Sequence, residues 1–453
     1  MTPEWIGFAG LVGFFVLLVC RVPIAMAMMI TGFVGIGAIN GFPAACATLS
    51  AETFEIASLI QLSVIPLFVL MGNLAGLSGM SRDLYSAAYA WAGHRRGGLA
   101  AATIIGCAGF AALSGSSFAS AVTMGRVALP EMRRFGYDDS LATGSVAAGG
   151  TLGFLIPPSS GFVIYAILTE QSIGKLFIAG IFPGLLLTAL FLLAISVVTY
   201  LKPDAGPAGP RAPYRERWRT LRRASMFILI VLVSIGGIYG GVMTPVEASG
   251  IGAFLTLIVA LARRSLNREG FRLVILHTLR TTALTFMILI GAHVFIPFMA
   301  LSEIPGNLLG FLTGLDVGAL GILLMILAMY ILLGTFLEGI AMLVLTLPVV
   351  FPVVMAMGYS PIWFGVVVVI VLVLNLGSSS LKYDLLDAGA PDRRVRGQVE
   401  RIGDQARFAA FVAGLSFGRM ARATESDVLD FSEDEIVRIV DGAVDTFMAR
   451  YGP

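Results

Sequence analysis

Charged residues and cysteines are scarce in this chain of 453 residues. Asp, Glu, Lys and Arg make up 13% of it, about half of what is usual in a soluble domain. The three cysteines, Cys20, Cys46 and Cys107, all lie in apolar segments, where cysteine commonly packs as a small apolar side chain. We therefore expect neither a disulfide framework nor a cysteine metal site, and the composition excludes an ordinary soluble protein.

The short motifs of enzymes are also missing. The glycine cluster at 149–153 lacks the Lys-Ser/Thr pair of a phosphate-binding loop, and neither a metal-ligand cluster nor a nucleophile triad is present. His293 lies in an apolar segment, where a packing histidine is expected and a proton relay is the alternative. With a net charge of +2, the sequence predicts no enzymatic activity, no organic cofactor and no nucleic-acid partner.

Apolar residues are abundant. They make up 57% of the chain, and the mean hydropathy of +0.90 is typical of a protein that crosses a membrane many times. Residues 1–5 carry no basic side chain and lead into an apolar run, so we expect a first membrane helix and not a cleaved signal. A spanning helix needs about 20 apolar residues. The candidate segments are 5–20, 24–40, 56–78, 97–122, 140–168, 176–200, 225–243, 246–262, 281–301, 317–335, 337–357 and 362–377.

Two basic segments set the expected orientation. The linker 201–224 is hydrophilic and rich in arginine, and a second basic loop covers 263–272. The excess of Lys and Arg in cytoplasmic loops predicts that both segments face the cytoplasm. These arginines are read as a topology signal, and contact with anionic lipids is the alternative.

Two prolines, Pro157 and Pro158, interrupt the segment 140–168. Each removes a backbone donor and clashes with the preceding turn, at a cost of about 3 kcal/mol in a helix interior. A broken helix at membrane depth is tolerated where it is buried in protein or lines a polar cavity, and secondary transporters build their sites from such breaks. A purely structural kink is the alternative. The residues expected to line the site are Thr151, Gly153, Pro157, Pro158 and Ser159.

A second interruption, Ser114-Gly115-Ser116-Ser117, falls in the segment 97–122. It offers successive backbone carbonyls with hydroxyls beside them, and Gly115 permits unusual backbone angles. Sodium, a hard cation, prefers oxygen ligands of this kind. The cluster is either the other half of an ion and substrate site or a packing face of small residues, and the residues alone do not decide between the two.

A weak internal repeat runs through the chain. Residues 130–137 match residues 352–359 in a Pro-x5-Gly-Tyr frame, an offset of 222 (352 − 130), and an apolar segment follows each copy. Corresponding broken segments in two halves are a pointer to a transporter built from two related repeats.

Ordered motifs along the chain resemble the large membrane subunit of tripartite ATP-independent periplasmic (TRAP) transporters. They are Ala112–Ser117, Pro130–Met132, Gly136-Tyr137, Thr151–Ser159, Ser172–Phe177, Gly237–Tyr239, Thr244–Ala248 and Gly358–Gly365. The resemblance covers about residues 1–377. It implies an all-α polytopic fold with two repeats and re-entrant or broken helical hairpins. It further implies sodium-coupled uptake of small organic carboxylates by alternating access in the bacterial inner membrane, with a small membrane subunit and a periplasmic substrate-binding protein as partners.

The resemblance favours an ion and substrate site at the two interruptions, with three further residues. Arg126 is expected to bind the substrate carboxylate through its guanidinium fork; a position at the cytoplasmic edge, or a pair with Glu131, is the alternative. Glu338 is expected to act in cation coupling or gating, with a structural carboxylate as the alternative, and Thr244 is a candidate for a second ion site. The expected sodium ligands are Ser114, Gly115, Ser116 and Thr151.

The sequence departs from the family after residue 377. The offset of 222 places the counterpart of Ile156-Pro157-Pro158 at Ser378-Ser379-Ser380 (156 + 222 = 378). Family members carry a second Pro-Pro hairpin and a further helix there, so the second repeat is predicted to be truncated. A non-transporting membrane anchor or scaffold, or an inactive truncated permease fused to a foreign tail, is therefore the alternative function.

The predicted organisation has four parts. They are a first membrane repeat (1–200), a basic cytoplasmic linker (201–224), a second membrane repeat (225–377) and a soluble helical tail (378–453). The tail contains no stretch long enough to span a bilayer, and Ser432–Glu435 has the pattern of a capping box before an amphipathic helix. The tail faintly resembles the C-terminal end of tetracycline-repressor-like regulators.

Overall fold

Helices are the only regular elements in the residues described by the computed structural model, which are 2–314, 317–334, 337 and 339–386. The α-helices are α1 (Pro3–Val19), α2 (Ile24–Asn40), α3 (Phe42–Ser58), α4 (Val64–Leu77), α5 (Met80–Ala92), α6 (Gly98–Ser114), α7 (Ser117–Arg134), α8 (Asp139–Thr151), α9 (Ser160–Leu168), α10 (Ile173–Leu201), α11 (Tyr214–Tyr239), α12 (Pro245–Ala262), α13 (Arg268–Leu301), α14 (Ile304–Gly314), α15 (Ala319–Leu333), α16 (Gly339–Ala356) and α17 (Pro361–Leu386). Short 3-10 helices are η1 (Ile60–Ser63), η2 (Leu152–Phe154) and η3 (Pro203–Ala205). The predicted all-α class is confirmed.

Six of the described helices are long and apolar enough to cross a membrane: η1 with α4, then α10, α11, α12, α13 and α16. Shorter apolar helices include α1, α2, α6 and α15. Only 17% of the most apolar 18-residue stretch of α10 is buried inside the protein. Phe182 and Leu185 on this helix are largely exposed. Such an apolar outer surface is expected for a helix that faces lipid.

Three helices, α3, α5 and α14, lie largely outside the predicted apolar segments. α5 carries Arg82 and Asp83, and α3 carries Glu52 and Glu55, so neither reads as an apolar run. α5 packs against α6 and α11 and buries Tyr85, and α3 packs against α2 and α13 and buries Ala45 and Ile56. Amphipathic helices of this kind need only a stripe of apolar contacts.

The predicted linker is shorter than expected. α11 begins at Tyr214, so the charged residues up to 224 belong to a helix that packs against α5. The preceding linker is held by backbone hydrogen bonds from the Gly97 amide to the Gly206 carbonyl and from the Gly209 amide to the Gly93 carbonyl, both 2.9 Å long. Arginine favours helix as readily as most apolar residues do, so a basic segment need not be a loop.

The last described helix extends past the predicted boundary at 377. α17 continues through 378–380 to Leu386, because serines, unlike prolines, donate their backbone N–H groups to the helix. The rest of the predicted tail, with its capping box, lies outside the described residues.

Helix boundaries support the internal repeat. Adding 222 to the bounds of α7 (117 and 134) gives 339 and 356, the bounds of α16. The same addition to the first residue of α8 (139) gives 361, where α17 begins. The predicted repeats therefore share a helix pattern well beyond the Pro-x5-Gly-Tyr match.

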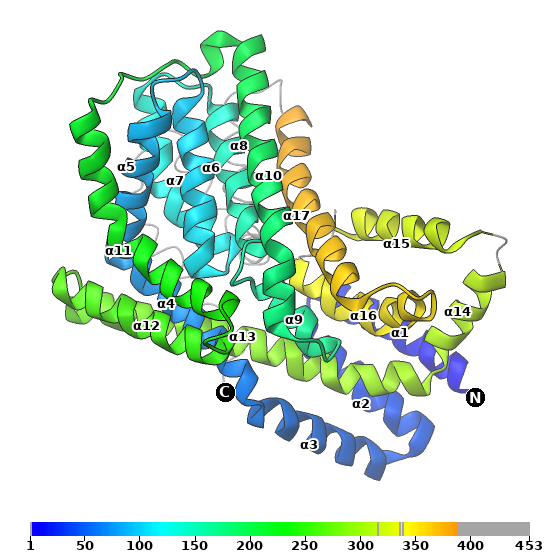
Figure 1. Ribbon diagram of the computed structural model, residues 1–453. Coiled ribbons are helices and arrows are strands. Elements are labelled where there is room, and N and C mark those ends of the chain that lie inside the picture. The colour runs from blue at the N-terminus through cyan, green and yellow to red at the C-terminus, as the bar shows by residue number, and fades with distance from the viewer. Residues whose placement is uncertain (1, 315–316, 335–336, 338, 387–453) are drawn as a thin grey trace, which may run out of the picture. The chain divides into compact units, whose positions relative to one another are not determined.

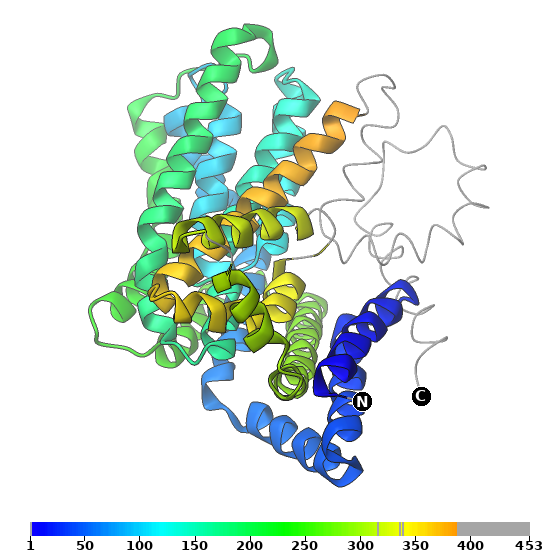
Figure 2. The ribbon, with the colours of Figure 1, turned by 90° about the vertical axis from the view of Figure 1, so that its right-hand side faces the viewer.

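The predicted breaks lie in a bundle within the first repeat. In Figure 1, α5, α6, α7, α8 and α10 run alongside one another, while α12 and α13 cross beneath them. Figure 2 shows α13 almost end-on, so this helix lies across the bundle and not along it. α6, α7 and α8 pack against each other within the bundle.

Candidate functional site

The serine cluster forms the tip of a helical hairpin. α6 ends at Ser114, Gly115 has a φ of +58°, and α7 begins at Ser117 after the N-cap residue Ser116. Because α6 and α7 pack against each other, the chain turns back at this tip. Gly115 makes the turn possible, since glycine adopts the left-handed backbone without a steric penalty.

The proline segment breaks a helix in two. α8 ends at Thr151, η2 follows, and α9 begins only at Ser160. The hydroxyl of Ser159 accepts a hydrogen bond from the Phe162 amide at 3.3 Å and so caps α9. Pro157, Pro158 and Ser159 are buried, so the break lies inside the protein and does not face lipid.

The two breaks touch each other. The Ser160 amide donates a hydrogen bond to the Gly115 carbonyl at 3.1 Å, and a Cβ atom on Gly115 would collide with the Pro158 carbonyl oxygen. A Cβ atom on Gly153 would lie 2.6 Å from the carbonyl oxygen of Ser116. Two glycines thus allow the backbones to approach more closely than side chains would permit. The residues predicted as two halves of one site lie together.

Four helix ends meet where the breaks cross. The contacts above place the C-terminus of α6 beside the N-terminus of α9, and the N-terminus of α7 beside η2, which follows α8. Helix ends leave backbone groups without intrahelical partners, and they carry about half an elementary charge, positive at N-termini and negative at C-termini. At the crossing, the carbonyls at helix C-termini are therefore suited to a cation and the amides at helix N-termini to an anion, as in the discontinuous helices of transporters.

Two of the predicted hydroxyl ligands are held by hydrogen bonds. Ser114 Oγ lies 2.9 Å from Ser120 Oγ, and Thr151 Oγ1 donates to the Ala148 carbonyl at 2.7 Å. A hydroxyl that donates its hydrogen keeps two lone pairs as acceptors. The local bonds thus fix the orientation of oxygens that a hard cation requires.

Arg126 lies outside the crossing. It follows Ser117 by nine positions on α7 (126 − 117), which is about 14 Å along the helix axis, and its side chain is exposed. The structure therefore does not bring Arg126 to the hairpin tip.

Thr244 is an exposed helix cap. Its amide donates to Glu247 Oε2 at 2.7 Å, and its hydroxyl oxygen accepts from the Glu247 amide at 3.3 Å, which is a capping box at the start of α12. No described contact joins Thr244 to the crossing. Glu338 lies outside the described residues.

One partly buried pair of a histidine and a glutamate was missed at the level of sequence. His293 Nδ1 on α13 lies 3.4 Å from Glu52 Oε2 on α3, with 18% and 23% of the two side chains exposed. The Nε2 atom of His293 is buried and has no hydrogen-bond partner within the described part of the chain. The signal was an acidic residue amid the apolar positions of a helix, which usually marks a specific partner.

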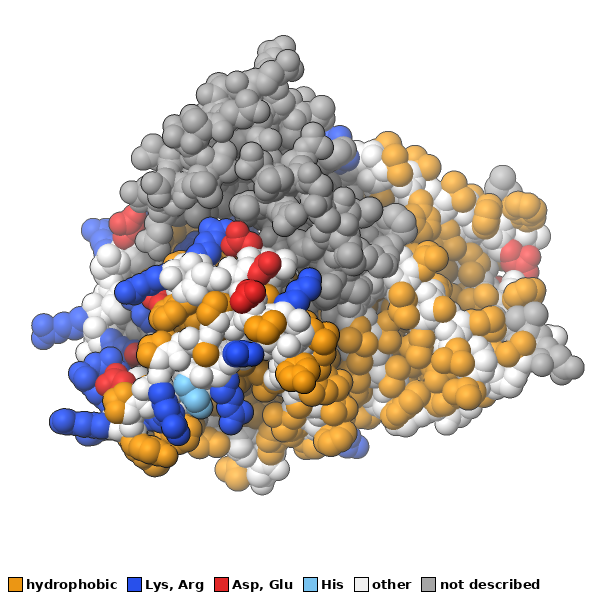
Figure 3. Space-filling view, turned by 90° about the horizontal axis from the view of Figure 1, so that it is seen from above, with side chains coloured by type: hydrophobic (Ala, Val, Ile, Leu, Met, Phe, Trp, Pro, Cys, Tyr) orange, Lys and Arg blue, Asp and Glu red, His pale blue; other side chains and the backbone are white. Residues whose placement is uncertain are grey.

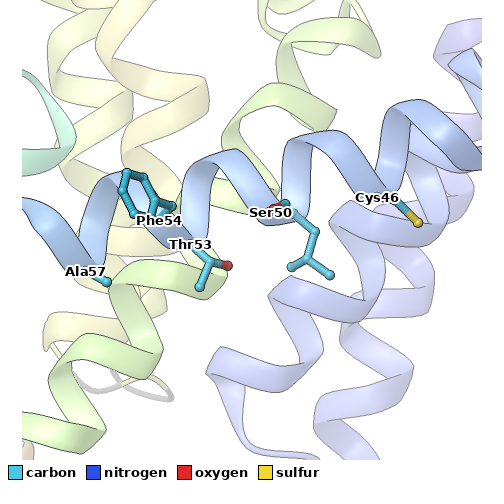
Figure 4. Close-up of a pocket in the computed structure, with 6 residues that line it drawn as sticks. Cys46, Ser50, Thr53, Phe54 and Ala57 are labelled. Atoms are coloured by element: carbon cyan, nitrogen blue, oxygen red, sulfur yellow. The ribbon is translucent and has the colours of Figure 1, made fainter.

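An open groove of about 490 Å³ runs along α3, and Figure 4 shows its lining side chains. All of them belong to this one helix: Cys46, Leu49, Ser50, Thr53, Phe54 and Ala57. No residue of either break contributes, so the groove is separate from the crossing.

Comparison with known proteins decides the family. The family model described as "Tripartite ATP-independent periplasmic transporter, DctM component" matches residues 11–378, which include both breaks. The chain belongs to this family. The DctM membership confirms the resemblance, and it shows that the chain is a multi-pass transporter permease of the bacterial inner membrane and not an enzyme.

Individual relatives extend over most of the chain. The C4-dicarboxylate TRAP transporter large permease protein DctM of Pseudomonas aeruginosa is 36% identical over 335 residues, which are 74% of this chain and 78% of that protein. The ectoine/5-hydroxyectoine TRAP transporter large permease protein UehC of Ruegeria pomeroyi is 30% identical over 387 residues, 85% of this chain and 90% of that protein.

A solved structure also shares the fold. The crystal structure of the YdaH transporter of Alcanivorax borkumensis matches with a TM-score of 0.50 and 16% identity, over 84% of this chain and 90% of that one. At this identity the likeness concerns the fold alone. The resemblance of the tail to tetracycline-repressor-like regulators stays a prediction.

Proposed function

We propose that this DctM-family permease takes up a small organic anion by alternating access, driven by a sodium gradient. The observation that carries the proposal is the crossing of the two breaks, where four helix ends and oriented hydroxyls converge inside the protein. In this mechanism the N-termini of α7 and α9 attract the carboxylate. The sodium ligands are Ser114, Gly115, Ser116 and Thr151.

The names of the relatives support the substrate class. C4-dicarboxylates, ectoine and sialic acid, which occur in those names, are all small organic acids. A tripartite system also needs two partners, and for this chain we propose a small membrane subunit and a periplasmic substrate-binding protein. Two sodium ions carried with a monoanion would move one net positive charge inward and gain about 2.3 kcal/mol per 100 mV.

Sodium binding is testable without knowing the substrate. Purified protein is heated in equal concentrations of sodium chloride and of potassium chloride, and the unfolding midpoints are compared. A ligand that binds only the folded state stabilises it, so we expect sodium to raise the midpoint by at least about 2 °C relative to potassium. Equal midpoints in the two salts would remove sodium from the proposal.

The matched variants are Ser114→Ala and Ser120→Ala. Each removes the same hydrogen bond between the two hydroxyls, but only Ser114 lies at the hairpin tip. We expect Ser114→Ala to lose the sodium effect and Ser120→Ala to keep it. The same loss in both variants would assign Ser114 a structural role only.

The two interpretations of Arg126 make opposite predictions for uptake into vesicles that contain the complete transporter. If Arg126 binds the substrate carboxylate, Arg126→Ala abolishes uptake of a C4-dicarboxylate. Arg126→Lys reduces it, because lysine lacks the bidentate fork. A role outside the site, at the cytoplasmic edge or in a pair with Glu131, requires that both variants transport normally. The exposed position of Arg126 on the arm of the hairpin favours the second outcome.

A further inference from the structure

Arg217 is a buried cation near the start of α11. Only 7% of the residue is exposed, and its guanidinium carbon lies 5.7 Å from the centre of the Trp91 ring and 5.2 Å from that of Tyr214. Trp91 belongs to α5, so the guanidinium joins the two helices. Contacts between cations and the faces of aromatic rings stabilise such a charge.

The two rings leave some hydrogen-bond donors of Arg217 without an acceptor. Its Nε and Nη2 atoms are buried and have no hydrogen-bond partner among the described residues. The acid next to it along the chain, Glu216, lies 3.8 Å from Arg219 instead. A buried charge without a hydrogen-bonded partner is costly, so this donor edge is suited to an external anion.

The surroundings place this edge at the surface of the membrane. Trp91, Tyr214 and Trp218 are 45%, 70% and 63% exposed, and aromatic residues of this kind gather at the level of lipid headgroups. The same turns of α11 carry the exposed Arg215, Arg219, Arg222 and Arg223. Figure 3 shows Lys and Arg side chains gathered on the face that also holds the upper end of the bundle in Figure 1.

We propose that Arg217, whose guanidinium lies near the rings of Trp91 and Tyr214, binds a phosphate group through its Nε and Nη2 atoms. The phosphodiester of an anionic phospholipid in the cytoplasmic leaflet fits the depth and the charge of the site, and inorganic phosphate has the same acceptor chemistry. Because both donor atoms are buried, a side chain must move to admit the phosphate, and we infer that it is the largely exposed Tyr214, whose ring centre lies 5.2 Å from the guanidinium carbon.

The test compares Arg217→Gln with Arg222→Gln in the full chain. Both variants remove one positive charge from the start of α11, but Arg222 is exposed. Delipidated protein is titrated with phosphatidylglycerol, with phosphatidylcholine and with inorganic phosphate, and bound lipid is counted by native mass spectrometry. Unfolding midpoints report on the inorganic phosphate. Arg217→Lys, which keeps the charge but not the fork, is the substitute should Arg217→Gln fail to fold.

We expect Arg222→Gln to weaken phosphatidylglycerol binding by at most about fivefold, the contribution of one surface charge. Arg217→Gln should weaken it by about 50-fold, because charged hydrogen bonds are lost in addition, and Arg217→Lys should lie between the two. Protection by lipid alone identifies a headgroup site, and equal protection by inorganic phosphate identifies a site for soluble phosphate. The proposal is overturned if Arg217→Gln and Arg222→Gln bind phosphatidylglycerol and inorganic phosphate equally well. Where Arg217→Gln does not fold, the same result for Arg217→Lys and Arg222→Gln overturns it.

Discussion

The two repeats place their helices at the same spacing and then differ at one break. α8 and α17 begin at equivalent residues, but α8 ends after 13 residues at Thr151, whereas α17 continues to Leu386. The positions equivalent to Pro157 and Pro158 are 379 and 380, which are serines. The proline pair removes two backbone donors in the first repeat, whereas the serines of the second repeat keep theirs.

The contact beside the break differs as well. Gly153 lies against the Ser116 carbonyl, backbone to backbone, and its equivalent in the second repeat is Asn375 (153 + 222). The Asn375 amide nitrogen donates to the carbonyls of Tyr330 at 3.1 Å and Ile331 at 2.9 Å, at the end of α15. The second repeat therefore satisfies its helix-end oxygens with a side chain. The first keeps backbone close to backbone, and we expect cation binding there.

The largest effect is expected from Gly115→Ala. Alanine at a φ of +58° costs about 1–2 kcal/mol, and its Cβ atom would also push against the Pro158 carbonyl. Gly136→Ala is the matched control, because Gly136 has a φ of +71° but nothing within 4 Å of an added Cβ. We expect uptake by the reconstituted transporter to fall at least about tenfold in Gly115→Ala and far less in the control. Similar losses in both would mean that the contact between the breaks does not matter.

Gly153→Asn makes the first repeat resemble the second. Its Cβ atom would lie 2.6 Å from the Ser116 carbonyl oxygen, so the two breaks must separate and the proposed sodium ligands move apart. We expect the difference in unfolding midpoint between sodium and potassium to disappear. Gly144→Asn, on the preceding helix α8 with open space around it, should keep that difference. Retention of the sodium effect in Gly153→Asn would show that the close approach is dispensable.

Asn375→Ala tests the second repeat. The Tyr330 and Ile331 carbonyls lose the Asn375 amide donor, and each lost hydrogen bond costs about 0.5–1.5 kcal/mol. The Tyr330 carbonyl keeps its bond from the Gly334 amide at 2.9 Å. We expect a lower unfolding midpoint with an unchanged response to sodium. A changed sodium response would place a cation in the second repeat and contradict the contrast drawn between the two.

The smallest effect is expected where the repeats meet. The Tyr165 hydroxyl on α9 donates to the Pro361 carbonyl at the start of α17, at 2.6 Å. Tyr165→Phe removes this one bond and should lower stability by about 0.5–1.5 kcal/mol, seen as a small fall in the unfolding midpoint. Tyr239→Phe removes a longer bond of 3.4 Å to the Phe177 carbonyl and should change less. A larger fall in the control would show that this contact does not hold the repeats together.

Much of the fold followed from local features of the sequence. Apolar runs located the long helices, Pro157 and Pro158 located one break, and the Ser-Gly-Ser-Ser cluster located the hairpin tip. These features act over a few residues, since proline and glycine limit or free the backbone where they stand. The amphipathic helices α3 and α5 were missed because their stability comes from packing against other helices, which no local pattern records.

The sequence by itself determined where the chain breaks and which segments are apolar enough to form membrane helices. The tertiary structure alone decided which breaks touch, that Arg126 stays away from them, and that Arg217 is buried between two rings while Arg222 on the same helix is exposed. The physical reason is that backbone angles are set by neighbouring residues. The surroundings of a charge or a carbonyl are instead set by helices that are distant along the chain.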